Sequence, residues 1–217
     1  MGSIVSGVGV LDKSVAVLDA VADAGGSCSL AELVERTGIA RATAHRLAVA
    51  LEAHGLLRRD ADGRFALGSR LVGLGRLAAD GWPFSAAARA DLEALRDETG
   101  ESVQLYVRDG DHRVCVVSLE SPHELRTIVA EGARLPLEVG SAGRLLRGER
   151  PDVGWTASVE ERAPGVASVS APVLGADRTV VAAVGVSGPI GRLGLDPGAR
   201  YGAAVAATAE RLAAMVR

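Results

Sequence analysis

The 217-residue sequence is poor in aromatic and sulfur-containing side chains, with two Trp, two Tyr, two Phe and two Cys. So few aromatic residues argue against a platform on which unpaired bases stack. Cys28 and Cys115 lie far apart and belong to no CxxC or CxxH motif, which argues against a disulfide framework and a cysteine-based metal site. The core must therefore be aliphatic and must hold without covalent or metal crosslinks.

Long hydrophobic runs are also missing. No segment approaches the roughly 18 apolar residues of a membrane span, and the first ten residues lack the basic and apolar regions of a signal peptide. We therefore expect a cytoplasmic protein with no membrane partner. Apolar residues make up 48% and charged residues 24% of the chain, a composition typical of globular domains.

Basic charge is scarce overall but concentrated in one segment. The net charge is −3, and Lys13 is the single lysine. Residues 36–64 nevertheless hold six arginines against three carboxylates. A basic patch within a mildly acidic chain is typical of a nucleic-acid-binding module joined to a second domain.

Hydrophobic spacing predicts three short helices near the N-terminus. Apolar residues follow helical spacing over 11–22, before a pair of glycines. Ser29 and Glu32 form a capping-box pattern that opens a second helix, and a glycine turn at 37–39 separates it from a third helix that begins near Arg41. Two short helices joined by a tight turn indicate a helix-turn-helix.

Two short strands, at 56–59 and 64–67, flank an Asp-Gly turn and predict a wing behind the third helix. A further helical pattern over 69–79 predicts a connecting helix. Three helices and a wing account for the chain only up to about residue 68, so a second domain must follow.

The remainder alternates between helix and strand patterns. Helices are predicted from Phe84 to Thr99, over 141–147 and over 201–215. Strands are predicted at 103–107, 114–119, 127–130, 135–139, 166–174 and 180–187. An antiparallel sheet flanked by helices is an α+β, sensor-like arrangement.

The outward face of the third helix carries polar side chains near its N-terminus, the half that a recognition helix presents to the major groove. Arginine can donate two hydrogen bonds to guanine, and Thr or His can contact phosphates or bases. With the wing, the candidate DNA-binding residues are Arg41, Ala42, Thr43, His45, Arg46, Arg58, Arg59 and Arg64. The alternative is a winged helix that binds protein and leaves these arginines solvated.

An enzyme that uses Cys115 as a nucleophile, helped by His112, is a second alternative. In an extended strand, positions 112 and 115 point to opposite faces, and no orienting carboxylate is evident. We therefore predict no catalytic residue, no cofactor and no metal ion, and interpret Cys115 as a small buried hydrophobic side chain.

Six stretches carry a family resemblance by their order and spacing. They are GVGVLDKS at 7–14, TGIARATAHRL at 37–47, GRFALG at 63–68, GSAG at 140–143, PGVASVSAPV at 164–173 and VSGP at 186–189. With them the chain resembles IclR-type transcriptional regulators, in particular an actinobacterial branch linked to amino-acid metabolism. The resemblance implies a winged helix-turn-helix DNA-binding domain at 1–68, a linker helix at 69–82, and a GAF-like effector-binding and oligomerisation domain at 83–217.

The same resemblance implies an effector pocket lined by Ser141, Ala142, Ser158, Val166, Ser168, Gly185 and Ser187. Relatives that bind small oxo acids often carry a polar or acidic residue at position 158, a Cys at 168 and a Ser at 185, so the ligand stays open between organic acids and amino acids. The serine hydroxyls and a helix start at Ser141 favour a small anion or zwitterion. The alternative is that these small residues only permit tight packing and caps.

Family members dimerise through the first helix and the linker, and their effector domains pair further. We therefore expect a homodimer, or a dimer of dimers, on a palindromic DNA operator with half-sites about one helical turn apart. Between Gly148 and Trp155 the chain lacks about thirty residues that cover one side of the sheet in relatives, and an uncovered apolar face is costly. We therefore expect a mobile segment missing from the sequence rather than a true deletion.

Overall fold

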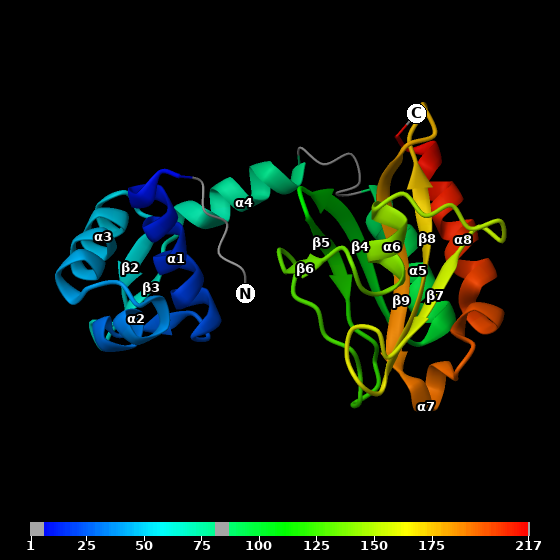
Figure 1. The fold of residues 1–217 in the computed structure, drawn as a ribbon, viewed down its shortest axis with the longest axis horizontal. Coiled ribbons are helices and arrows are strands. Elements are labelled where there is room, and N and C mark those ends of the chain that lie inside the picture. Colours follow the sequence, from blue (N-terminus) through cyan, green and yellow to red (C-terminus); the bar gives the residue numbers. More distant parts are fainter. Residues whose placement is uncertain (1–6, 81–86, 217) are drawn as a thin grey trace. The chain divides into compact units, whose positions relative to one another are not determined.

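The computed structural model describes residues 7–80 and 87–216, which form two compact units that divide between Ala78 and Ala79 (Figure 1). The N-terminal elements are α1 (Gly9–Asp23), β1 (Ser27–Cys28), α2 (Leu30–Thr37), α3 (Arg41–Ala53), β2 (Leu57–Arg59), β3 (Phe65–Leu67) and α4 (Arg70–Asp80). The predicted linker helix corresponds to α4, and its last two predicted positions, 81 and 82, lie outside the described residues.

The predicted capping box opens α2. The hydroxyl of Ser29 accepts the N–H of Glu32 at 3.3 Å, and the Glu32 carboxylate accepts the N–H of Ser29 at 2.7 Å. Gly38 ends α2 with φ of 66°, a left-handed conformation that glycine adopts without steric cost. The three helices then enclose a core that includes Val17, Val21, Leu33, Ala44, Leu51 and Phe65.

The wing is held to the rest of the N-terminal unit by a third strand. β3 pairs antiparallel with β2 and also with β1, a two-residue strand too short to leave a sequence pattern. The Asp60 carboxylate accepts the N–H groups of Asp62 and Arg64 at 3.0 and 2.9 Å and the hydroxyl of Ser27 at 2.6 Å. One side chain therefore shapes the wing turn and links it to β1.

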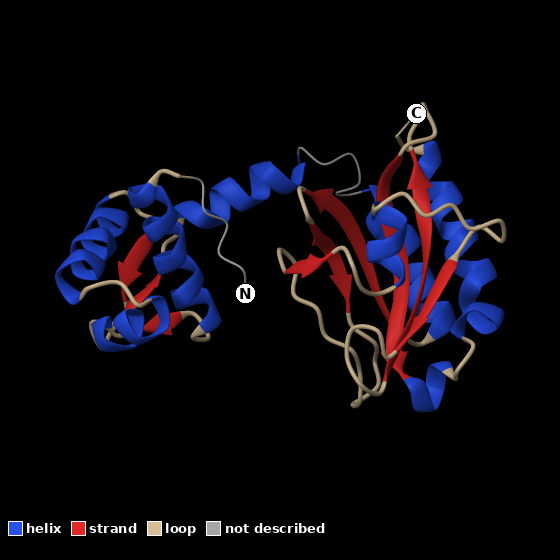
Figure 2. Ribbon diagram, viewed as in Figure 1, coloured by secondary structure: helices blue, strands red, loops and turns tan. Residues whose placement is uncertain are grey.

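The C-terminal unit is a six-stranded antiparallel sheet with helices on both faces (Figure 2). Its elements are α5 (Ala87–Thr99), β4 (Ser102–Asp109), β5 (His112–Leu119), β6 (Arg134–Pro136), α6 (Ser141–Leu146), β7 (Thr156–Val159), β8 (Val166–Leu174), β9 (Val180–Pro189), α7 (Ile190–Leu193) and α8 (Pro197–Ala214). The strand order is β6-β5-β4-β9-β8-β7. Together with the winged helix-turn-helix, this confirms the predicted α+β fold class.

Two different layers cover the sheet. On one face, α5 and α8 pack against the apolar side chains of β4, β8 and β9, where Leu92, Leu105, Val169, Val184 and Val205 are among the buried residues. On the other face, α6 covers a smaller cluster that contains Leu145, Tyr106 and Cys115 (Figure 1). Both faces of β4 are therefore buried.

The predicted strand at 127–130 is wrong. These residues form no ladder, because the carbonyl of Thr127 accepts the hydroxyl of Ser102 at 2.7 Å and Ala130 begins a turn to Ala133. The predicted strand at 135–139 is right only in part, since β6 ends at Pro136. Proline has no N–H for a ladder, and the chain turns after it toward α6.

Other boundaries also differ from the predictions. β7 and α7 were not predicted, because four-residue elements carry too little periodicity. α8 begins before Tyr201, since Asp196 caps it by accepting the N–H of Ala199 at 3.1 Å. The helix predicted from Phe84 to Thr99 corresponds to α5, which begins at Ala87; the predicted start at Phe84 lies outside the described residues.

A short link, residues 147–155, joins α6 to β7. The Glu149 carboxylate accepts the hydroxyl of Thr156 at 2.9 Å, which ties the link to the start of β7. Trp155, the last residue of the link, packs against α8 at two glycines. A Cβ atom at Gly198 would lie 1.9 Å from the nearest indole atom, and one at Gly202 would lie 2.3 Å from it, so the indole requires glycine at both positions.

No helix within the described ranges is both long and apolar enough to cross a membrane.

We predict that Gly202→Ala destabilises the C-terminal unit. Overpacking costs about 1–3 kcal/mol, which exceeds the ~0.5–1 kcal/mol that alanine gains over glycine inside a helix. Gly191→Ala is the control, because a Cβ there meets nothing within 4 Å. Urea unfolding followed by Trp fluorescence measures both variants, and equal midpoints for Gly202→Ala and the unmodified chain would contradict the packing.

Candidate functional site

The predicted recognition residues of α3 lie on its solvent side. Arg41, Ala42, His45 and Arg46 are exposed and Thr43 is half-buried, whereas the opposite side of the helix faces the core. Within the described part of the chain, the side chains of Arg41, His45 and Arg46 make no hydrogen bond or ion pair with another residue. Their donors are therefore free for an external partner.

Arg59, predicted as a wing contact, is engaged within its own domain. Its guanidinium lies 3.4 Å from the Glu52 carboxylate and donates to the carbonyl of Gly63 at 2.8 Å. It also stacks over the Phe65 ring at 3.9 Å from the centroid. These contacts hold the wing turn against α3.

Arg64 is likewise engaged. It donates to the Glu32 carboxylate at 2.6 Å and to the hydroxyl of Ser27 at 3.2 Å. Hydrogen bonds from Ser29 lower the pKa of Glu32, and Arg64 lowers it further, so this carboxylate is ionised at neutral pH. Arg58, by contrast, is exposed and donates to no other described residue.

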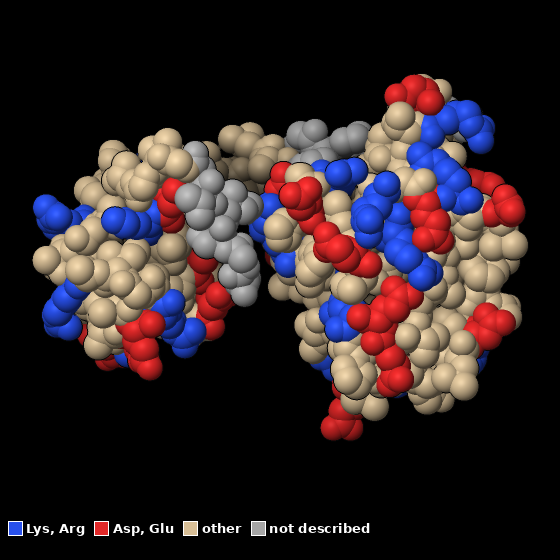
Figure 3. Space-filling view, viewed as in Figure 1, with Lys and Arg blue, Asp and Glu red and all other residues tan. Residues whose placement is uncertain are grey.

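The structure thus divides the eight candidates into an unengaged set on α3 and at Arg58, and two arginines that brace the wing. On the visible face of the N-terminal unit, basic side chains stand at separate points rather than in one continuous patch (Figure 3). On this face, separate arginines rather than a broad basic surface are available to a nucleic acid.

In the C-terminal unit, strand register brings the predicted pocket residues onto one face. Ser158 pairs with Ser168, and Ser168 pairs with Ser187. Paired residues of an antiparallel ladder carry their side chains on the same face. One row across three strands therefore presents three hydroxyls toward α6, which begins at Ser141.

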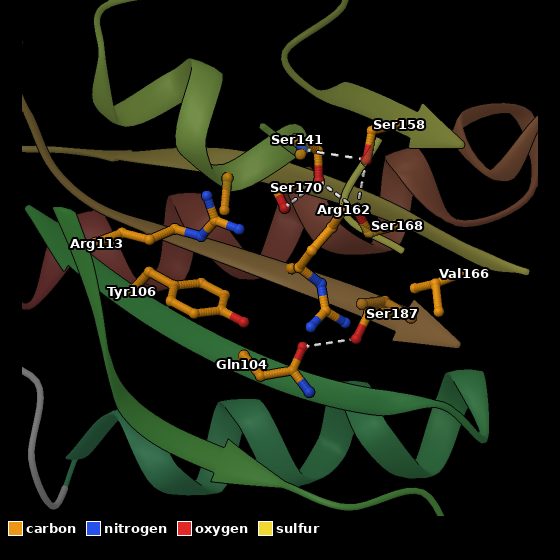
Figure 4. A pocket seen from close by; sticks show the side chains of 14 residues that line it. Gln104, Tyr106, Arg113, Ser141, Ser158, Arg162, Val166, Ser168, Ser170 and Ser187 are labelled. Carbon is orange, nitrogen blue, oxygen red and sulfur yellow. Dashed lines mark hydrogen bonds between the residues drawn. The ribbon is translucent and has the colours of Figure 1, made fainter. Parts of the chain in front are cut away.

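Hydroxyl contacts join four serines into one network (Figure 4). Ser141 Oγ lies 2.8 Å from the hydroxyls of both Ser168 and Ser170, and Ser158 Oγ lies 2.9 Å from Ser168 Oγ. The N–H of Ser141 donates to Ser158 Oγ at 3.2 Å. Ser187 stands apart and donates to Gln104 Oε1 at 2.9 Å.

These serines line a cavity that we call the serine pocket. All seven predicted residues line it, Ser141, Ala142, Ser158, Val166, Ser168, Gly185 and Ser187. The sequence-based prediction missed seven further lining residues, of which five have polar side chains: Gln104, Tyr106, Arg113, Arg162 and Ser170. Ser170 could have been found, because it lies two residues beyond Ser168 on the same strand and therefore faces the same way.

Two glycines make room for the pocket's polar groups. A Cβ at Gly185 would lie 2.3 Å from Ser170 Oγ, so the serine expected in relatives at position 185 cannot coexist with this Ser170 rotamer. A Cβ at Gly143 would lie 2.5 Å from an Arg113 nitrogen. Arg113 therefore passes under α6 only because α6 carries glycine there.

The alternative nucleophile, Cys115, pairs with Tyr106 across β4 and β5 on the sheet face that α6 covers, and it is fully buried. Burial raises its pKa to about 12, so the sulfur remains a thiol at neutral pH. His112 lies at the far end of β5 and is half-buried. No cluster of three metal-ligating His, Cys, Asp or Glu side chains occurs among the residues that the structure describes.

Comparison with known proteins gives matches to both units. The IclR helix-turn-helix domain matches residues 10–61, and the bacterial transcriptional regulator IclR C-terminal domain matches residues 78–152 and 149–214. The second match breaks where the short link joins α6 to β7.

Similar individual proteins are regulators. The glycerol operon regulatory protein of Streptomyces griseus is 29% identical over 84% of this chain and 85% of its own length. The HTH-type transcriptional regulator KipR of Bacillus subtilis is 37% identical over 54% of this chain and 47% of its own. A crystal structure of an IclR homolog complexed with 4-hydroxybenzoate, from Microbacterium hydrocarbonoxydans, has a TM-score of 0.74 at 19% identity, over 94% of this chain and 99% of the homolog.

We predict that Cys115 reacts slowly in the folded protein. A pKa of about 12 in place of the ordinary 9.0 leaves roughly 1000-fold less thiolate on Cys115 at neutral pH. A Cys28→Ala chain isolates this thiol, and mass spectrometry after iodoacetamide treatment at neutral pH, with and without denaturant, measures its reactivity. Rapid labelling of the folded chain would revive the nucleophile alternative.

Proposed function

The chain belongs to the IclR family of bacterial transcriptional regulators, and on that premise we propose that it is an effector-responsive regulator that binds a palindromic DNA operator in the cytoplasm. Family members are regulators rather than enzymes; they bind DNA through the helix-turn-helix domain and small molecules through the C-terminal domain. The proposal concerns which residues of this chain recognise DNA and what the serine pocket holds.

The observation that carries the DNA proposal is the exposed, unengaged N-terminal half of α3. We assign Arg41, His45 and Arg46 to base edges in the major groove, where arginine can donate two hydrogen bonds to guanine. Ala42 and Thr43 complete the contact surface. Thr43 is placed to contact a phosphate or a thymine methyl group.

The wing takes a supporting role in this proposal. Arg58 contacts the phosphate backbone, because it is exposed and donates to no described residue. Arg59 and Arg64 position the wing, since each already holds a carboxylate of its own domain. Donors that they retain can still add phosphate contacts at the wing.

The effector proposal rests on the serine pocket. Its hydroxyls and other donors converge on one small cavity, as expected of a site for a small organic acid or amino acid. The homolog complexed with 4-hydroxybenzoate is consistent with an organic acid here.

We propose that effector binding in a GAF-like domain of a homodimer, or of a dimer of dimers, changes the packing of the linker helix. This change would alter the spacing of two recognition helices.

Such a switch has a thermodynamic requirement. An effector shifts the equilibrium only if it binds the DNA-bound and DNA-free arrangements with different affinity, and DNA must then change effector affinity by the same factor. Effector titrations with and without operator DNA should therefore give different dissociation constants.

We predict that Arg46→Ala weakens binding to the operator more than binding to random duplex. Loss of a bidentate base contact costs about 1–3 kcal/mol, or about 5- to 150-fold, on the specific site. Fluorescence anisotropy measures this on a labelled duplex from upstream of the protein's own gene and on a random duplex, across a salt series.

Arg58→Ala is the matched control for this experiment. A lost phosphate contact lowers both affinities about equally and reduces the salt slope by about one. Equal losses on both duplexes for Arg46→Ala would reassign it to the backbone. Absence of salt-dependent binding to either duplex by the unmodified chain would favour the alternative of a protein-binding winged helix.

We predict that Ser168→Trp abolishes the response to effectors and preserves basal DNA binding, because an indole at this position fills the serine pocket. Small organic acids and amino acids are screened by their effect on thermal unfolding, and hits are tested for their effect on anisotropy. Val153→Trp, at an exposed site in the short link, is the control. An unchanged response in the Ser168→Trp variant would place the effector elsewhere.

A further inference from the structure

The serine pocket contains two arginines and no carboxylate. Arg113 comes from β5 and is 3% exposed, and Arg162 comes from the turn between β7 and β8 and is half-buried. Figure 4 shows both guanidinium groups directed into the pocket, with that of Arg162 reaching toward Gln104 and Ser187. Neither arginine takes part in an ion pair with any residue that the structure describes.

Neutral groups alone hold Arg113 in place. It donates to the carbonyls of Pro136 and Val139, the latter at 2.7 Å, and lies over the Tyr106 ring at 5.4 Å from the centroid. Its buried Nε has no partner. Burial lowers the pKa of Arg113, and the nearby charge of Arg162 lowers it further, against the opposing influence of Tyr106 and Glu138. Arginine stays charged in proteins, so both positive charges persist.

Two further polar side chains of the pocket, Gln104 and Tyr106, are hydrogen-bond donors. Gln104 is 2% exposed, and its Oε1 is occupied by the hydroxyl of Ser187, which leaves the buried Nε2 without an acceptor. Burial raises the pKa of Tyr106, so its hydroxyl is a neutral donor. A buried donor without an acceptor is costly, and a ligand rich in acceptors removes that cost.

The pocket is nearly filled by its own side chains. The space open to water-sized molecules is about 30 Å³, and a single water needs roughly 10–15 Å³. Arg162 is the lining cation nearest to solvent and stands on a turn in which Glu160 has φ of 57° and accepts the N–H of Gly165 at 2.8 Å. A ligand larger than one or two waters therefore requires a lining side chain to move.

We propose that the effector of this pocket is a small molecule with two carboxylates. One carboxylate is bound at the inner end by Arg113 and Tyr106, and the other nearer the mouth by Arg162 and Gln104. A monocarboxylate would leave one guanidinium uncompensated, whereas two separated carboxylates match two cations. This inference rests on the proposed function, in which the serine pocket is the effector site.

Isothermal titration calorimetry of the full chain tests the proposal with ligand pairs of equal length at constant ionic strength. The pairs are succinate and butyrate, glutarate and pentanoate, and adipate and hexanoate. Inorganic phosphate is added as an anion that carries its charge on one centre and has no carboxylate. We expect at least one dicarboxylate to bind about 10-fold or more tightly than its monocarboxylate partner, the effect of one added charged hydrogen-bonding pair.

Variants locate the two carboxylates. Arg162→Gln should weaken dicarboxylate binding about 10- to 100-fold and bring it close to that of the matched monocarboxylate. Arg147→Gln removes the same charge from an exposed position at the end of α6 and should change neither affinity. Arg113→Lys tests whether the guanidinium of Arg113 binds the inner carboxylate, because lysine retains the positive charge. If this variant fails to fold, the Arg162→Gln result alone tests the two-carboxylate proposal.

The outcomes separate the two hypotheses. Equal binding of both members of every pair, abolished by Ser168→Trp, would keep the effector pocket and overturn the two-carboxylate inference. Phosphate binding as tight as the best dicarboxylate would overturn it as well, because charge alone would then suffice. Absence of binding throughout the series, or binding unaffected by Ser168→Trp, would overturn both the inference and the assignment of this pocket as the effector site.

Discussion

The register between β8 and β9 is the constraint on which the C-terminal unit depends. In this register Ser168 lies opposite Ser187 and Ser170 lies opposite Gly185, while Val169 faces the core beneath α5 and α8. A slip of one residue would exchange the two faces of a strand. It would place valine in the pocket and serine in the core, so the same pairing determines both the stability of the sheet and the chemistry of the site.

Local patterns account for what could be predicted. Helical spacing and a capping box identify the N-terminal helices, and long apolar strands identify β8 and β9, because these signals lie within a few neighbouring residues. Alternation over 103–108 identifies one buried face of β4. It does not reveal that Gln104 and Tyr106 on the other face are buried too, since that depends on α6 and on β9, some eighty residues away along the chain.

The pocket residues that the sequence analysis missed were missed for the same reason: their burial depends on contacts that are distant in sequence. Arg113 resembles an ordinary solvated arginine in sequence, and only the glycine at position 143 and the carbonyls after β6 make it a buried cation. The six arginines of residues 36–64 are equivalent by composition. The structure distinguishes them by whether a carboxylate is within reach, and Glu32 meets Arg64 only through folding, because 32 residues separate the two in sequence.

One carboxylate, that of Glu32, serves two purposes: it caps the start of α2 and it anchors the wing through Arg64. Motion of the wing relative to α2 would break this exposed ion pair together with the β1–β3 pairing and the hydrogen bond from Ser27 to Asp60. The helix-turn-helix and the wing are therefore coupled as a rigid body. A regulatory signal from elsewhere in the chain would have to reposition this head as a whole rather than change its internal shape.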